Sequence, residues 1–190
     1  QPDVEASKIE TRKLTSRYEK TGALAPETAV LEDEGIALHT DAANAAHLAR
    51  TAGDSSLEGY LRAHLGRIGR GDYFALLAYI EMTAPNLALL QQIRHQVRDV
   101  TRAATCLGFG PRFLHSTGQA YKGGPSAGVF LQITCDDAED LIVPGQKYTF
   151  GVVKSAQARG DFAVLAERGR RALRVHLGSN VSSGLKTLRA

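Results

Sequence analysis

The chain has 190 residues, 43% of them hydrophobic and 23% charged, a composition typical of a globular domain with its own core rather than of a disordered chain. Its formal net charge is only +3 and it has no tryptophan, so no extended basic surface for nucleic acid is predicted. No apolar run has the length of a bilayer-spanning helix and no secretory signal pattern opens the sequence, so we expect a cytoplasmic protein without a membrane partner.

The two cysteines, Cys106 and Cys135, stand in or beside apolar runs. Such positions are typical of buried thiols in a reducing compartment, although a disulfide between the two stays open at this point. The cysteines match no paired metal-ligand spacing, so neither a metal site nor a cofactor is predicted.

Residues 1–32 are polar and mixed in charge, and the apolar positions between Ser7 and Lys20 are sparse for a packed helix. We expect this segment to be a loosely attached extension, or the remnant of a preceding domain. The more regular pattern that follows predicts one domain over residues 33–190.

The domain opens with a short predicted strand at Gly35–Leu38. Thr40 is then a candidate cap for a helix that reaches Arg50, because a threonine hydroxyl can accept hydrogen bonds from the first free amides of a helix. Ser56 is a candidate cap for a second helix over Leu57–Ile68, whose apolar residues recur at helical spacing.

Three apolar runs predict buried strands, because each is short, nearly continuous and bounded by turn-forming or polar residues. These runs are Tyr73–Ile80, Ala104–Phe109 and Val129–Thr134. Between the first two, Thr83 and Pro85 are typical of a helix start, and the apolar spacing extends that helix to about Arg102.

The C-terminal third predicts two helices, over residues 149–158 and 162–167, and then a strand at Arg170–Leu177. In that strand Arg174 and His176 alternate with apolar residues, which predicts a half-exposed strand. Strands that alternate with helices predict an α/β fold, a three-layer sandwich around a parallel sheet. Ligands of such sheets bind beyond the carboxyl ends of the strands.

Two residues with acid–base chemistry follow predicted strands. Glu81 comes directly after the first buried strand, and His115 follows the second by a short loop. A carboxylate and an imidazole at one crevice are the minimum equipment for proton transfer at neutral pH. Taken singly, Glu81 also fits a solvated loop or helix-terminus charge, and His115 fits a structural or solvated loop residue.

The loop that carries His115 is rich in glycine and small polar residues over residues 110–125. Ser116, Thr117 and Gln119 are compact hydrogen-bonding groups, and the glycines let the backbone approach a ligand. The pattern fits a phosphate or sugar-hydroxyl site and equally a polar turn between strands. It is not a P-loop, because no Gly-x4-Gly-Lys-Ser/Thr pattern is present.

The segment Leu114-His115-Ser116-Thr117-Gly118-Gln119 resembles the histidine loop of phosphoglucose isomerases, a Leu-His-Ser-x-Gly-Gln stretch that precedes a strand. Residues 148–161 and 169–178 add a resemblance to one branch, the isomerase half of bifunctional transaldolase/phosphoglucose isomerase fusions. The resemblance covers about residues 35–178. It implies a sugar-isomerase (SIS) domain with a flavodoxin-like fold, agreeing with the α/β pattern.

The resemblance also implies roles for individual residues. His115 would assist ring opening of a hexose phosphate, and Glu81 would carry the proton between C2 and C1 through a cis-enediolate. Lys154 would help ring opening, although it also fits a solvated helix lysine. The implied substrate contacts are Ser116, Thr117, Gln119, Lys122 and Gln157.

Two parts of the family's site have no counterpart here, the serine/threonine-rich phosphate loop and the arginine of a Gly-Gly-Arg segment. We therefore expect a C-terminal lobe that works with a preceding SIS lobe, and with a transaldolase domain if the parent is a fusion. Because the family's histidine often reaches a neighbouring subunit, a homodimer stays open. The alternatives are a non-catalytic module that binds a phosphosugar and a structural lobe that completes a neighbour's site.

Overall fold

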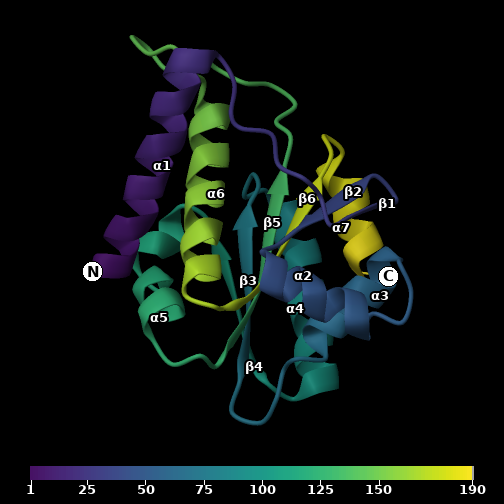
Figure 1. Ribbon diagram of the computed structural model, residues 1–190. Helices are drawn as coiled ribbons and strands as arrows, with labels where there is room; N and C mark the ends of the chain where they lie inside the picture. The colour runs from purple at the N-terminus through teal and green to yellow at the C-terminus, as the bar shows by residue number, and fades with distance from the viewer. Residues whose placement is uncertain (190) are drawn as a thin grey trace.

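The structure is a computed structural model that describes residues 1–189. These residues form three layers, with a mixed β-sheet between two layers of helices (Figure 1). In spatial order the strands are β1 (Leu31–Asp33), β2 (Ile36–His39), β6 (Arg171–Leu177), β5 (Gly128–Cys135), β3 (Tyr73–Tyr79) and β4 (Ala104–Phe109). The four strands from β6 to β4 are mutually parallel. The predicted α/β three-layer sandwich is therefore confirmed.

The expectation of a wholly parallel sheet is wrong at one edge. β2 pairs with β6 in the antiparallel sense, and β1 folds back onto β2. Glu34 and Gly35 form the two-residue turn of this hairpin, with φ values of 51° and 74°. Positive φ values at both positions match the twist of a tight hairpin, so the turn directs β2 back along β1.

Helices cover both faces of the sheet. The helices are α1 (Pro2–Thr21), α2 (Ala42–Thr51), α3 (Leu57–Leu65), α4 (Ala84–Thr101), α5 (Gly118–Gly123), α6 (Phe150–Glu167) and α7 (Val181–Arg189), with a 3₁₀ turn η1 (Arg112–His115). Among residues 1–189, no helix combines the length and the apolar character that a membrane crossing requires.

Side-chain caps begin several helices where the sequence predicts them. The Ser56 hydroxyl accepts a hydrogen bond from the Gly59 amide at 3.0 Å, which begins α3. Thr83 caps α4 in the same way. The predicted cap Thr40 is wrong, because Asp41 caps α2 while the Thr40 hydroxyl donates to the Ala172 carbonyl at 2.7 Å.

The central strands carry alternate side chains into two cores. Phe74, Leu76 and Ala78 of β3 point toward α2, α3, α4 and α7, whereas Leu77 and Tyr79 point toward α5 and α6. All five are at most 1% exposed. This two-sided burial explains why β3 is a nearly continuous apolar run rather than an alternating one.

Three local predictions differ from the structure. The two helices expected over residues 149–167 are one continuous helix, α6, which includes Gly160. The expected half-exposed strand β6 is buried between β5 and β2. The expected buried strand β4 is instead the half-exposed edge of the sheet. Neither α7 nor the short helix α5 was expected from the sequence pattern.

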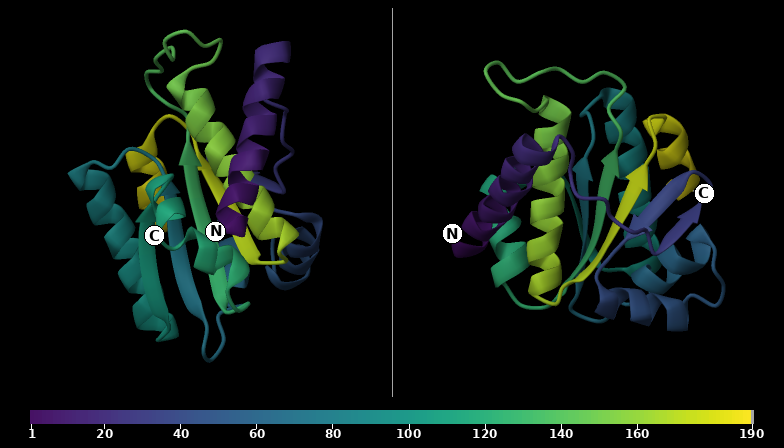
Figure 2. Two further views of the ribbon diagram at one scale, coloured as in Figure 1. Left: turned by 90° about the vertical axis from the view of Figure 1, so that its left-hand side faces the viewer. Right: turned by 45° about the horizontal axis from the view of Figure 1, so that its top comes forward.

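The N-terminal segment is not loosely attached, contrary to expectation. Helix α1 lies alongside α6 and outside the sheet, as Figures 1 and 2 show. Asp3 and Ser7 are buried in this contact, and Arg168 binds the Asp3 carboxylate at 2.9 Å. The predicted domain boundary between residues 32 and 33 falls inside β1.

Gly160 lets the backbones of α1 and α6 approach each other. A Cβ at this position would lie 2.8 Å from Thr11 Oγ1, 2.9 Å from Thr11 N and 3.0 Å from the Ser7 carbonyl oxygen. Backbone atoms cannot yield to such a contact unless the whole of α1 shifts. The glycine, which the sequence pattern treats as a helix break, therefore has a packing role.

We expect Gly160→Ala to lower the free energy of unfolding by about 1–2 kcal/mol, because the overpacking cost exceeds the gain in helix propensity. Urea unfolding followed by circular dichroism measures the change, and limited proteolysis at residues 22–30 reports detachment of α1. Ala163→Gly, on the exposed side of α6, calibrates the propensity term. A Gly160→Ala protein more stable than wild type would contradict close packing at this position.

Candidate functional site

The order of the parallel strands places a crevice at one position along the sheet. From β3 the chain moves outward to β4 and then returns past β3 to β5, on the other side. The connections that leave β3 and β5 therefore diverge to opposite faces of the sheet. This topological switch lies at the carboxyl ends of β3 and β5, where open α/β sheets bind ligands.

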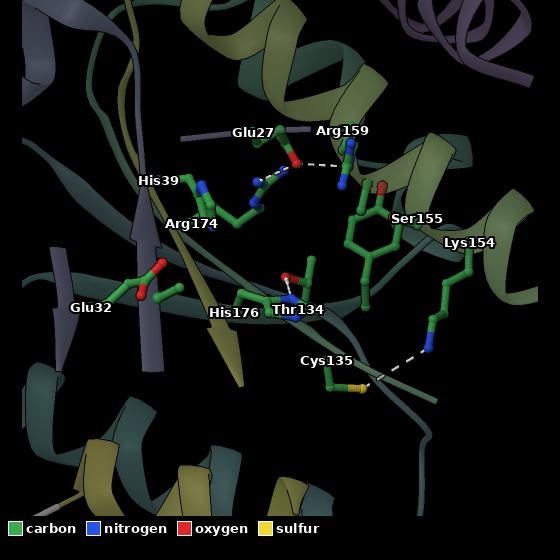
Figure 3. A pocket seen from close by; sticks show the side chains of 13 residues that line it. Glu27, Glu32, His39, Thr134, Cys135, Lys154, Ser155, Arg159, Arg174 and His176 are labelled. Carbon is green, nitrogen blue, oxygen red and sulfur yellow. Dashed lines mark hydrogen bonds and ion pairs between the residues drawn. The ribbon is translucent and has the colours of Figure 1, made fainter. Parts of the chain in front are cut away.

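A cavity of about 290 Å³ lies beside this switch, on the face of the sheet covered by α6 (Figure 3). It is bounded by the sheet, by the first turns of α6 and by the segment that leads from α1 to β1. The lining residues are Glu27, Glu32, Ala37, His39, Tyr79, Thr134, Cys135, Lys154, Ser155, Ala158, Arg159, Arg174 and His176.

Pairing between strands sets the polar floor of the cavity. Thr134 of β5 stands opposite His176 of β6, and Arg174 stands opposite His39 of β2. Arg174 and His176 point to the same face because they are two residues apart in one strand. The Thr134 hydroxyl lies 3.0 Å from His176 Nδ1, which holds the imidazole in one orientation.

Glu27 bridges two arginines at the wall of the cavity. Its Oε2 atom lies 2.6 Å from Arg159 Nε and 2.8 Å from an Arg174 Nη atom. The Arg174 side chain is only 4% exposed, and its guanidinium lies 5.7 Å from the centre of the Phe162 ring. Burial, and then the charge of Arg174, lower the pKa of the neighbouring His39, so this imidazole is neutral at pH 7.

Lys154, from the second turn of α6, lies at the opposite side of the cavity. It forms an ion pair with Asp137, and its Nζ lies 4.0 Å from Cys135 Sγ. Burial raises the pKa of the Cys135 thiol, which therefore stays protonated at neutral pH although Lys154 opposes the shift. Both cysteines are partly buried and unpaired, so the disulfide left open by the sequence does not form.

Glu81 lies on the loop between β3 and α4, close to the topological switch. It is exposed, and the hydrogen bonds near it hold its backbone, since the Asn86 side chain donates to the Glu81 carbonyl at 3.0 Å. Helix α4 starts three residues later, and the positive end of a helix dipole favours a negative charge there. Glu81 does not line the cavity.

The loop after β4 turns back over its own strand. Phe113 of η1 packs on Gly108, where an added Cβ would lie 3.0 Å from the phenylalanine Cβ. His115, Ser116 and Thr117 are exposed on the outer side of this turn, and none of them lines the cavity. The structure therefore places Glu81 and His115 after neighbouring strands, while Lys154 alone among the predicted site residues reaches the cavity.

Two predicted substrate contacts have structural partners instead. The Gln119 side chain donates to the Asp3 carboxylate at 2.5 Å and accepts from the Asp3 amide at 3.1 Å, which anchors the start of α1. Lys122 is buried and forms an ion pair with Asp161 of α6. Gln157, also predicted as a contact, is half-buried on α6 and does not line the cavity.

Sequence reasoning missed most of the residues around the cavity. Glu27, His39, Arg159 and Arg174 come from four separate segments, so no local motif unites them. One signal was present, the alternation that places Arg174 and His176 on one side of β6. That alternation predicts a solvent-facing side just as readily, because a half-exposed strand and a polar cavity floor have the same period of two.

The fold and the cavity define an α/β protein with a flavodoxin-like order of its parallel strands. The structure resembles the crystal structure of a hypothetical protein from Thermus thermophilus, with a TM-score of 0.60 and 18% sequence identity. The match covers 79% of this chain and 43% of the Thermus chain, and at this identity it concerns the fold alone. No known family model matches the sequence. No curated protein matches it either.

Within residues 1–189, no group of three or more histidine, cysteine, aspartate or glutamate side chains is placed to hold a metal ion. Groups able to act on a ligand include the exposed acid–base side chains of Glu81 and His115, and the arginine pair at the cavity wall, of which Arg174 is buried and Arg159 is partly exposed.

Proposed function

We propose that this chain is the C-terminal SIS lobe of a cytoplasmic glucose-6-phosphate isomerase, one that interconverts glucose 6-phosphate and fructose 6-phosphate without metal or cofactor. One observation carries the proposal, the exposure of Glu81 and His115 on the loops that follow two adjacent parallel strands, β3 and β4. An acid–base pair that is not consumed by internal contacts remains available to a substrate held against this edge.

In the proposed reaction His115 assists opening of the sugar ring, by proton exchange at the ring oxygen or the anomeric hydroxyl. Glu81 removes the proton from C2 as a carboxylate. It returns that proton to C1 of the cis-enediolate, while the hydroxyl proton at C2 passes to the oxygen on C1, so the carboxylate is regenerated and no external acid is consumed. Within residues 1–189, no hydrogen bond or ion pair engages the Glu81 carboxylate, so both of its oxygens are open to a substrate.

The remaining parts of the site come from a preceding SIS lobe of the same polypeptide, which would grip the phosphate and stabilise the enediolate. A transaldolase domain further upstream, and pairing as a homodimer, belong to the same proposal. The likeness of residues 114–119 to the histidine loop of phosphoglucose isomerases supports it, and the flavodoxin-like strand order agrees with an SIS domain.

Glu81→Gln in the full-length polypeptide is the direct test. We expect kcat for glucose 6-phosphate isomerisation to fall by about 10²–10⁴-fold, the usual contribution of a general base, with little change in KM. A coupled assay of fructose 6-phosphate formation measures both constants. Glu139→Gln, which removes an exposed carboxylate from the loop after β5, is the matched control.

His115→Ala extends the test to ring opening. Its deficit should be smaller when the assay begins from substrate enriched in the open-chain form, because the ring-opening step is then bypassed. Near wild-type rates in both Glu81→Gln and His115→Ala would overturn the assignment of these residues, and with it the catalytic role of the lobe.

A non-catalytic phosphosugar-binding module is the second candidate. The position of Glu81 and His115 outside the cavity favours it, because a phosphosugar bound in the cavity would not contact either of these acid–base groups. This module would bind glucose 6-phosphate equally well with Glu81→Gln, and the full-length wild-type polypeptide would not isomerise it.

A further inference from the structure

The arginine pair beside Glu27 has no part in the proposed isomerisation. Arg159 comes from α6 and Arg174 from β6, and both guanidinium groups meet one carboxylate oxygen, Glu27 Oε2 (Figure 3). Glu27 lies on the irregular segment between α1 and β1, and about one third of its side chain is exposed. A carboxylate from an irregular segment therefore neutralises a cationic site built from two regular elements.

The Glu27 carboxylate leaves some of the buried nitrogen atoms at this site without a hydrogen-bond partner. Within the described residues, Arg174 Nε and His39 Nδ1 are buried and have no hydrogen-bond partner. The Arg174 side chain is 4% exposed, so water does not compensate its missing bond. A buried guanidinium with an unused donor is costly unless another acceptor completes it.

A phosphate dianion has the geometry to complete the site. Glu27 offers one oxygen atom to two arginines, whereas phosphate has three or four acceptor oxygens in a tetrahedral arrangement. Guanidinium groups match this arrangement better than ammonium groups do, because their planar donors contact two oxygens at once. An anion in the place of the Glu27 carboxylate would meet Arg159 Nε and the Arg174 Nη, and it would offer further oxygens to the unused Arg174 Nε.

We propose that the cavity beside Arg159 and Arg174 binds a phosphate group, and that the Glu27 carboxylate occupies this position in the unliganded protein and is displaced when phosphate binds. The ligand is a phosphate monoester or free phosphate, which share the same chemistry. A volume of about 290 Å³ accommodates the phosphate together with a small organic portion. Only the Glu27 side chain must rotate away, because α6 and β6 fix both arginines.

If Glu27 and phosphate compete for the two arginines, removing the Glu27 charge should raise the affinity for phosphate. Glu27→Gln removes the competing charge while keeping the size of the side chain, so the affinity for inorganic phosphate should rise at least about tenfold. Isothermal titration of the full chain with inorganic phosphate at pH 7.5 and constant ionic strength measures this change. Glu19→Gln, an exposed position on α1, changes the net charge equally and should leave the affinity unaltered.

Variants of the two arginines test the same site by removing the groups that would bind the phosphate. Arg159→Gln in the Glu27→Gln background should abolish the gain, and Arg159 is partly exposed, so this variant is expected to fold. Arg174→Lys keeps the positive charge but removes the planar donors, and should weaken binding if it folds. The proposal is overturned if Glu27→Gln and Glu19→Gln bind phosphate alike, or if Arg159→Gln leaves the gain intact.

Titration with glucose 6-phosphate and with glucose distinguishes the two sources of phosphate. A gain for glucose 6-phosphate in Glu27→Gln, and none for glucose, supports a phosphate monoester as the ligand. A gain for inorganic phosphate alone supports free phosphate. Neither result depends on turnover, so the binding site stands or falls separately from the catalytic roles of Glu81 and His115.

Discussion

Lys122→Met is expected to lower the free energy of unfolding by about 3–5 kcal/mol at pH 7, since it leaves Asp161 buried without its partner. The ion pair of Lys122 and Asp161 joins α5 to α6, and both side chains are at most 1% exposed. Burial raises the pKa of Asp161, although the positive charge of Lys122 opposes that shift. Urea unfolding followed by circular dichroism measures the loss.

The pH dependence of the Lys122→Met deficit identifies its cause. Without the ammonium group, the raised pKa of Asp161 rises further, and the carboxyl can be buried in its neutral form by taking up a proton. The deficit should therefore be larger at pH 7 than at pH 5, because a raised carboxyl pKa stabilises the fold at low pH only.

The double variant Lys122→Met, Asp161→Leu completes the cycle. It should recover most of the lost stability, because replacing a buried ion pair by apolar side chains is often neutral or favourable. A deficit below about 1 kcal/mol in the single variant, without pH dependence, would contradict a buried pair. It would favour the ligand-binding role that the histidine-loop resemblance implies for Lys122.

Acidification from pH 7 to pH 5 is expected to remove about 2 kcal/mol of stability through His64 alone. His64 is fully buried on α3, and its Nε2 donates to the Phe130 carbonyl at 3.0 Å. Burial, and then the charge of Arg67, lower its pKa from 6.5 to about 3. A lowered histidine pKa contributes stability that is present above pH 6.5 and is lost as the pH falls toward 3.

His64→Gln should flatten this part of the stability profile, since the amide still has a donor for Phe130 but does not titrate. The relevant readout is the slope of unfolding free energy against pH, so a change in baseline stability does not affect the conclusion. His95→Gln, at an exposed position on α4, should keep the wild-type slope. An unaltered slope in His64→Gln would contradict the burial of a neutral imidazole.

Much of the α/β framework could be predicted from local patterns. The strands β3 and β5 are continuous apolar runs because both of their faces are covered, and such runs are visible in a sequence. The caps Ser56 and Thr83 act through hydrogen bonds within four residues, so their sequence signature is equally local.

The departures arise where distant contacts override local patterns. Gly160 interrupts the helical pattern, yet α6 continues through it because α1 packs against that position. Strand β6 has the alternation of an exposed strand, but β2 and the N-terminal segment cover it from more than 130 residues away. No single-sequence pattern reports such coverage.

The residues of the candidate site likewise divide into those that local sequence patterns reveal and those that depend on distant contacts. Glu81 and His115 could be found because each follows a predicted strand, and the structure places them after adjacent strands. Gln119 and Lys122 belong to the same motif as His115, but a motif does not reveal that α1 and Asp161 will engage them. The arginine pair escaped notice because its members lie on α6 and β6, and its counter-ion Glu27 lies before β1.

The pairing of β2 with β6 has a consequence for synthesis of the chain on the ribosome. Residues 36–39 find their partner strand only when residues 174–177 have emerged, and α1 likewise waits for α6. Chains grow at about 5–20 residues per second, so the pairing of β2 with β6 waits for roughly 7–28 s after residue 39 has been made. The last elements of this unit thus complete the packing of its first elements, so the sheet cannot close before residues 174–177 have been made.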